Sequence, residues 1–108
     1  MCIRDSAFNW TGETTGTWYQ IVISRINSNM SCYINTQQIG TTQSNSTNYS
    51  VLTKFGNPPL RFARTSVSGG VLYYFNGRIP IARVYNGKGL TASEIQQNFN
   101  ATRGRYGI

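Results

Sequence analysis

The sequence predicts an all-β domain of antiparallel strands that ends in one short helix. Segments rich in β-branched and aromatic residues recur along the chain with turn residues between them, enough for about five to seven strands. The residues near 91–102, in contrast, carry the start signals and apolar spacing of a helix. The 108 residues show no internal repeat and no linker, so their length fits one domain at most.

The first predicted element is a β-hairpin over residues 18–35. Residues 18–26, WYQIVISRI, form the clearest strand, and neither of its faces is purely polar, as expected inside a sandwich. Residues 30–35, MSCYIN, form the returning strand, and the Asn-Ser-Asn sequence at 27–29 is a turn.

The connection after this hairpin is expected to be wide. Thr36 disfavours a positive φ, which argues against a tight primed turn and for a longer path through Gln37, Gln38 and Gly40. Residues 41–50, TTQSNSTNYS, are poor in apolar side chains and predict a surface loop or a weak edge strand.

Three more segments predict strands. They are residues 60–65 (LRFART), 71–75 (VLYYF) and 78–85 (RIPIARVY). Pro80 has no amide donor, so the last of them belongs at a sheet edge or carries a bulge.

The predicted helix begins with a capping box. Thr91 and Glu94 have the spacing at which each side chain bonds the other residue's amide. Ile95 and Phe99 then share one face, which must dock on a larger surface because a short helix is not stable alone. Gly104 is the expected stop signal.

The C-terminal run YFNGRIPIARVYNGKGLTASEIQQNFNATRGRYGI resembles the end of laminin-G-like modules of the concanavalin A-like lectin/glucanase superfamily. The shared features are an aromatic residue and a glycine, a strand ending in Tyr-Asn, a Leu-Thr-x-x-Glu-Ile helix start and an Asn-aromatic-Asn sequence. The resemblance implies a two-sheet antiparallel β-sandwich, the concanavalin A-like jelly roll, with the helix packed against its rim.

The resemblance also bears on the domain bounds. Complete modules are longer before the Trp-containing strand, so residues 7–108 are interpreted as a partial domain truncated at its N-terminus. Residues 1–6, MCIRDS, match the translation of a sequencing adapter, and we interpret them as an artefact of a metagenomic fragment. In the family an early strand pairs beside residues 79–85, so exposed amides and apolar side chains are expected there.

The net charge of +7 has two interpretations. It could attract polyanions such as acidic polysaccharide or nucleic acid, or it could keep a chain rich in uncharged polar residues soluble. The basic residues are scattered rather than grouped, which favours solubility, and the LRFART segment is too short to indicate a nucleic-acid surface. No apolar run reaches about 18 residues, so no membrane span is expected.

The sequence predicts no enzyme, no metal and no cofactor. Glycoside hydrolysis needs a pair of carboxylates, and a calcium site needs several oxygen ligands. Outside residues 1–6 only Glu13 and Glu94 remain, Glu94 has a capping role, and the chain has no histidine. Without Cys2, Cys32 has no disulfide partner and is expected to be a small buried apolar side chain.

The candidate ligand-binding residues are aromatic and basic side chains in the predicted loops and strands. Aromatic faces pack against sugar C–H surfaces, and arginine donates to hydroxyls. The candidates are Tyr49, Arg61, Arg64, Tyr73 and Tyr74.

The sequence thus suggests a non-catalytic carbohydrate-binding or adhesion module within a larger secreted, cell-surface or virion structural protein. Its partner would be a glycan or polysaccharide, an anionic one included. Two alternatives stay open: a structural spacer or decoration domain without a sugar site, and the remnant of a glucanase-like enzyme whose acids lie elsewhere.

Overall fold

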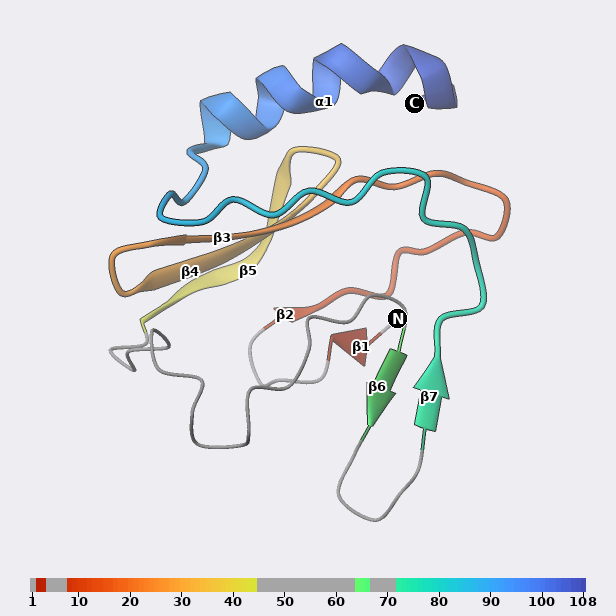
Figure 1. Ribbon diagram of the computed structural model, residues 1–108, viewed down its shortest axis with the longest axis horizontal. Coiled ribbons are helices and arrows are strands. Elements are labelled where there is room, and N and C mark those ends of the chain that lie inside the picture. Colours follow the sequence, from red (N-terminus) through yellow and green to blue (C-terminus); the bar gives the residue numbers. More distant parts are fainter. Residues whose placement is uncertain (1, 4–7, 45–63, 67–71) are drawn as a thin grey trace. The chain divides into compact units, whose positions relative to one another are not determined.

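The computed structural model describes residues 2–3, 8–44, 64–66 and 72–108 (Figure 1). The chain divides into two compact units, residues 1–47 with 85–108, and residues 48–84. In the described ranges every strand pair is antiparallel and one helix lies at the C-terminus, which confirms the coarse fold class. The stacking of two sheets into a sandwich stays a prediction. The elements are β1 (Cys2–Ile3), β2 (Phe8–Asn9), β3 (Ile21–Ile26), β4 (Asn29–Ile34), β5 (Gln37–Ser44), β6 (Arg64–Ser66), β7 (Leu72–Tyr74) and α1 (Ala92–Tyr106).

The first unit contains a three-stranded sheet in the order β3-β4-β5. The predicted hairpin is confirmed, although its first strand begins at Ile21 rather than at residue 18. Ile26 pairs with Asn29, so the turn has two central residues. The first of them, Asn27, has a φ of 55° and the second does not have a positive φ, which is the φ pattern of a type II′ turn.

The connection from β4 to β5 is a tight turn, and the predicted wide path through Gln37, Gln38 and Gly40 is wrong. Ile34 pairs with Gln37, and the two residues between them both have positive φ, 45° at Asn35 and 74° at Thr36.

Two hydrogen bonds between Asn35 and Gln20 explain why Thr36 can take a positive φ. The Asn35 amide donates to the Gln20 carbonyl at 3.0 Å, and the Gln20 amide donates to Asn35 Oδ1 at 2.8 Å. These bonds hold the turn in place, while the left-handed conformation of Thr36 costs about 1–2 kcal/mol.

Replacing Thr36 by glycine should therefore raise the free energy of unfolding by about 0.5–1 kcal/mol, because the relief of strain exceeds the entropy that glycine adds to the unfolded chain. Urea denaturation followed by tryptophan fluorescence measures the change. Thr41→Gly is the matched control, since Thr41 lies in β5 without a positive φ and glycine should destabilise it. A loss of stability in Thr36→Gly would contradict the strain.

β5 is an edge strand of this sheet, which is one of the two alternatives predicted for residues 41–50; residues 45–50 lie outside the described part. Its register against β4 shifts between Met30 and Cys32, and Gly40 supplies a φ of 64° at that bulge. Cys32 is a fully buried free thiol, as predicted, and burial raises its pKa.

The second unit contains the β6–β7 hairpin, which overlaps two of the predicted strand segments; β6 extends one residue beyond the predicted 60–65. The predicted strand at 78–85 is wrong: in the described ranges no strand pairs with these residues. A strand needs a ladder partner as well as the right residue types, and Pro80 removes one donor. The expected exposure of its apolar side chains is confirmed, with Ile79 46% and Val84 66% exposed.

The helix α1 begins where the sequence predicts. Thr91 is its N-cap, and both bonds of the capping box with Glu94 are present. The predicted end near 102 with Gly104 as stop is wrong, since the helix continues to Tyr106. Gly107 takes the left-handed conformation instead, with a φ of 67°, and the amides of Gly107 and Ile108 both donate to the Arg103 carbonyl.

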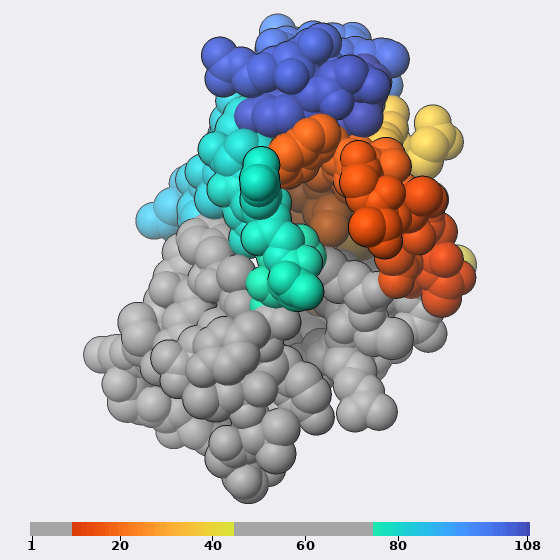
Figure 2. All heavy atoms as spheres, turned by 90° about the vertical axis from the view of Figure 1, so that its right-hand side faces the viewer, coloured from red at the N-terminus to blue at the C-terminus, as the bar shows by residue number. Residues whose placement is uncertain are grey.

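The helix packs on the first unit through its apolar face and through a ring contact near its C-terminal end. Ile95 is 0% and Phe99 6% exposed, as predicted for a docked face. Near the C-terminal end the Tyr106 ring lies 5.3 Å from that of Trp18, and Figure 2 shows the blue helix lying directly on the orange N-terminal part of this unit. None of the described helices is long and apolar enough to cross a membrane.

Gly89 sets how closely the chain passes β3 before the helix begins. A Cβ at this position would lie 2.0 Å from the Arg25 carbonyl oxygen and 2.7 Å from Ile26 Cγ1. Backbone atoms cannot yield as the end of a side chain can, so the approach requires glycine.

Gly89→Ala should lower the free energy of unfolding by about 1–3 kcal/mol, the usual cost of overpacking. Gly104→Ala is its control, because a Cβ there meets nothing within 4 Å and alanine favours a helix interior by about 0.5–1 kcal/mol. Thermal unfolding followed by circular dichroism compares the two. Equal stability of both variants would contradict the close approach of Gly89 to the Arg25 carbonyl.

Candidate ligand-binding site

The sequence-predicted candidates fall in the second unit or outside the described residues. Tyr49 and Arg61 lie outside them. In the β6–β7 hairpin the register pairs Arg64 with Tyr74, and Thr65 with Tyr73. The backbone thus places Tyr74, rather than Tyr73, directly across from Arg64. All five residues stay predictions as ligand contacts.

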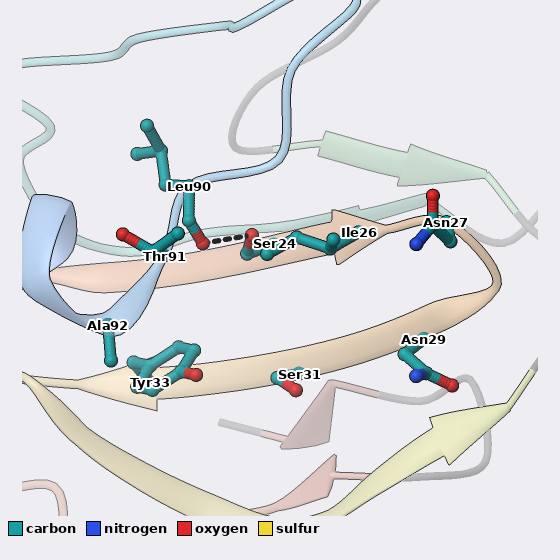
Figure 3. A pocket seen from close by; sticks show the side chains of 9 residues that line it. All are labelled: Ser24, Ile26, Asn27, Asn29, Ser31, Tyr33, Leu90, Thr91 and Ala92. Carbon is teal, nitrogen blue, oxygen red and sulfur yellow. Dashed lines mark hydrogen bonds between the residues drawn. The ribbon is translucent and has the colours of Figure 1, made fainter.

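A hollow that the sequence analysis missed lies in the first unit, between the β3–β4 hairpin and the start of the helix (Figure 3). Its volume is about 330 Å³, near the lower end of the 300–1,000 Å³ found for small-molecule sites. We call it the hairpin pocket. It is lined by Ser24, Ile26, Asn27, Asn29, Ser31, Tyr33, Leu90, Thr91 and Ala92.

The strand register explains why the hairpin residues share one face. Ser24 pairs with Ser31, and Ile26 pairs with Asn29. Tyr33 lies two positions beyond Ser31 on β4, so all these side chains leave the same side of the sheet. In Figure 3 the Tyr33 ring lies beneath Ala92, and Asn27 and Asn29 mark the far end of the pocket at the turn.

The opposite wall is held in place by a hydrogen bond from the sheet. The hydroxyl of Ser24 donates to the Leu90 carbonyl at 2.6 Å, across 66 positions of sequence. Ser24 is only 6% exposed, so this hydroxyl is part of the wall rather than a group that a ligand can reach.

Two other polar groups of the pocket have internal partners. The Ser31 hydroxyl lies 3.1 Å from that of Thr42, and the Asn27 carbonyl accepts from Arg25 Nε at 3.1 Å.

The remaining polar groups are open to a ligand. Within the ranges that the structure describes, the side-chain amides of Asn27 and Asn29 and the hydroxyl of Tyr33 have no hydrogen-bond partner. The pocket therefore offers two amides and an aromatic ring to whatever enters it.

Two charged side chains, Glu94 and Lys88, are linked to the pocket through Thr91 but do not line it. The Thr91 amide donates to Glu94 Oε2 at 2.9 Å, and Glu94 also forms an ion pair with Lys88. The Lys88 ammonium first, and the Thr91 amide second, hold the pKa of the Glu94 carboxyl below its ordinary value. The positive end of the helix dipole is thus already met by a carboxylate of the chain itself.

The lowered pKa of Glu94 predicts a pH-dependent contribution to stability. Because the folded pKa lies below the unfolded one, the contribution is complete above the ordinary value of 4.5 and is lost as the pH falls through the folded pKa. The Glu94→Gln variant should have a lower melting temperature than the unchanged protein at pH 7, and the difference should shrink in acid.

Melting temperatures measured from neutral pH into acid test this, with Lys88→Met as the comparison. Lys88→Met should keep part of the dependence, because the Thr91 amide still donates to the carboxylate. If the difference in melting temperature between Glu94→Gln and the unchanged protein stays the same in strong acid, the ionised carboxylate is not its cause.

The described residues contain no group of three or more His, Cys, Asp or Glu side chains that could hold a metal ion. From the sequence, Asn27 and Asn29 were predicted only as turn residues. No local signal connects them to residues 90–92, since only the folded chain brings these segments together.

Comparisons with known proteins agree with this fold. A laminin-G-type family model described as "Concanavalin A-like lectin/glucanases superfamily" matches residues 5–96. The chain therefore belongs to this family, which confirms the resemblance of its C-terminal run. The search of curated proteins found no match.

A solved structure is similar in fold. It is the crystal structure of an S-layer domain-containing protein (residues 221–444) from Clostridium thermocellum ATCC 27405, with a TM-score of 0.63 and 18% sequence identity. The similarity covers 83% of this chain and 42% of that one, so the chain spans less than half of the solved protein.

Proposed function

We propose that the chain is a non-catalytic, carbohydrate-binding module of a larger extracellular or cell-surface protein. Membership of a lectin-like superfamily supports a sugar ligand. The similarity in fold to an S-layer domain-containing protein supports a surface location. A virion structural protein remains a second location for the same module.

The hairpin pocket is the observation that carries the proposal. It combines a tyrosine ring with two asparagine amides, the residue types that receive the apolar face and the hydroxyls of a sugar. A volume of about 330 Å³ suits one sugar unit rather than a long chain segment.

The absence of catalysis is part of the proposal. None of the residues lining the pocket is a carboxylate, whereas glycoside hydrolysis uses two. Glu94 is not among the lining residues, and its oxygens are bonded to Thr91 and to Lys88. A remnant of a glucanase would need acids supplied from outside the pocket.

A glycan array probed with the full chain should give signal on a restricted set of sugars, and Asn29→Ala should lower it at least about tenfold, the effect of losing one or two hydrogen bonds. Asn29 is exposed at the end of β4, so the fold should survive the change. Asn100→Ala, on the exposed side of the helix, is the matched control and should leave the signal unchanged.

Tyr74→Ala separates the two candidate sites. Loss of binding in this variant, with Asn29→Ala unaffected, would move the site to the β6–β7 hairpin predicted from the sequence. No specific signal for the unchanged chain would favour the alternative of a structural spacer or decoration domain without a sugar site.

A further inference from the structure

We infer that the hairpin pocket selects an uncharged sugar unit and discriminates against the same unit carrying a carboxylate. The inference rests on the proposed function and goes further by naming the ligand class. It runs against one of the two interpretations of the net charge of +7, the attraction of an anionic partner.

The pocket has no cationic side chain in its lining. All nine residues that line it are uncharged. Arg25 is the basic residue of this hairpin, and its Nε donates to the Asn27 carbonyl at the turn. A carboxylate entering the pocket would lose hydration, and none of the side chains that line the pocket is a cation that could replace it.

A carboxylate of the chain itself is bonded to one of the lining residues. Glu94 Oε2 accepts from both the amide and the hydroxyl of Thr91, at 2.9 and 3.2 Å, and Thr91 lines the pocket. One backbone donor at this helix start, the Thr91 amide, therefore already serves a negative group. A ligand carboxylate at Thr91 would have to compete with Glu94 for the donors of that residue.

The open polar groups of the pocket match sugar hydroxyls better than a carboxylate. An asparagine side chain offers both a donor and an acceptor, and so does a sugar hydroxyl. Asn27 and Asn29 can each exchange two hydrogen bonds with neighbouring hydroxyls. A carboxylate only accepts, so it would leave the amide oxygens without partners.

The net charge acts differently, because it acts at long range. The field of scattered cations attracts anions to the whole surface, but salt screens it over about 8 Å at physiological ionic strength. Selection inside the pocket should therefore persist in salt, while surface attraction fades.

The test uses pairs of sugars that differ only at one carbon: methyl glucoside with methyl glucuronide, and methyl galactoside with methyl galacturonide. Each is titrated into the isotope-labelled full chain, and the side-chain amide signals of Asn27 and Asn29 are followed by NMR. In the pair that binds, the neutral sugar should bind at least about tenfold more tightly at physiological salt. Its Kd should change less than about twofold when the salt is raised further.

Glu94→Gln supplies the residue-level test. Glutamine preserves the capping box, so the helix start should remain. The variant should improve uronide binding several-fold and leave the neutral sugar unchanged. Glu13→Gln removes one negative charge outside the pocket lining and should leave the ratio of the two affinities as it was.

Each other outcome overturns the inference in a distinguishable way. Uronide binding that equals or exceeds neutral binding at the Asn27 and Asn29 signals overturns the selectivity and leaves the proposed function standing. Binding that shifts signals elsewhere overturns the pocket and leaves a carbohydrate-binding module. No binding of any of these sugars, together with a blank glycan array, overturns both.

Discussion

The hydrogen bond from Ser24 to the Leu90 carbonyl is the constraint on which the first unit depends. It joins the edge strand β3 to the residue just before the helix cap, and its donor is almost fully buried. A buried hydroxyl such as that of Ser24 that loses its partner costs about 1–3 kcal/mol. Because Leu90 precedes Thr91 directly, the bond also sets where the helix begins above the sheet.

This connection contributes to both the docking of the helix and the shape of the pocket. With Leu90 held at β3, and with Gly89 allowing the close approach, Ile95 and Phe99 reach their buried positions. The same placement brings Thr91 and Ala92 over the open face of the hairpin. Stability and a ligand-sized hollow therefore share this connection.

The elements that the sequence predicted well are those set by neighbouring residues. The hairpin at residues 18–35 follows from alternation and the polar turn residues at 27–29, and the helix start follows from Thr91 and Glu94 three positions apart. The helix end was misplaced because Gly104 and Gly107 are both acceptable stops locally. Only the bonds to the Arg103 carbonyl distinguish them.

The elements that failed depend on residues far away in sequence. Thr36 takes a positive φ because bonds to Gln20 hold the turn, and propensity alone could not foresee that support. Residues 78–85 have strand composition but no ladder partner in the described ranges. The hairpin pocket was missed for the same reason, since it assembles two strands and the approach to a helix.

The charge of the whole chain and the charge of the pocket point to different ligands. A net charge of +7 describes the field far from the surface, where individual side chains are not resolved. A bound sugar, however, contacts only the groups that line the pocket, and those are uncharged, with a carboxylate bonded to one of them. Because desolvation and direct contacts act at the shortest range, the local arrangement should decide which ligand stays bound, and the net charge should affect only how fast charged molecules arrive.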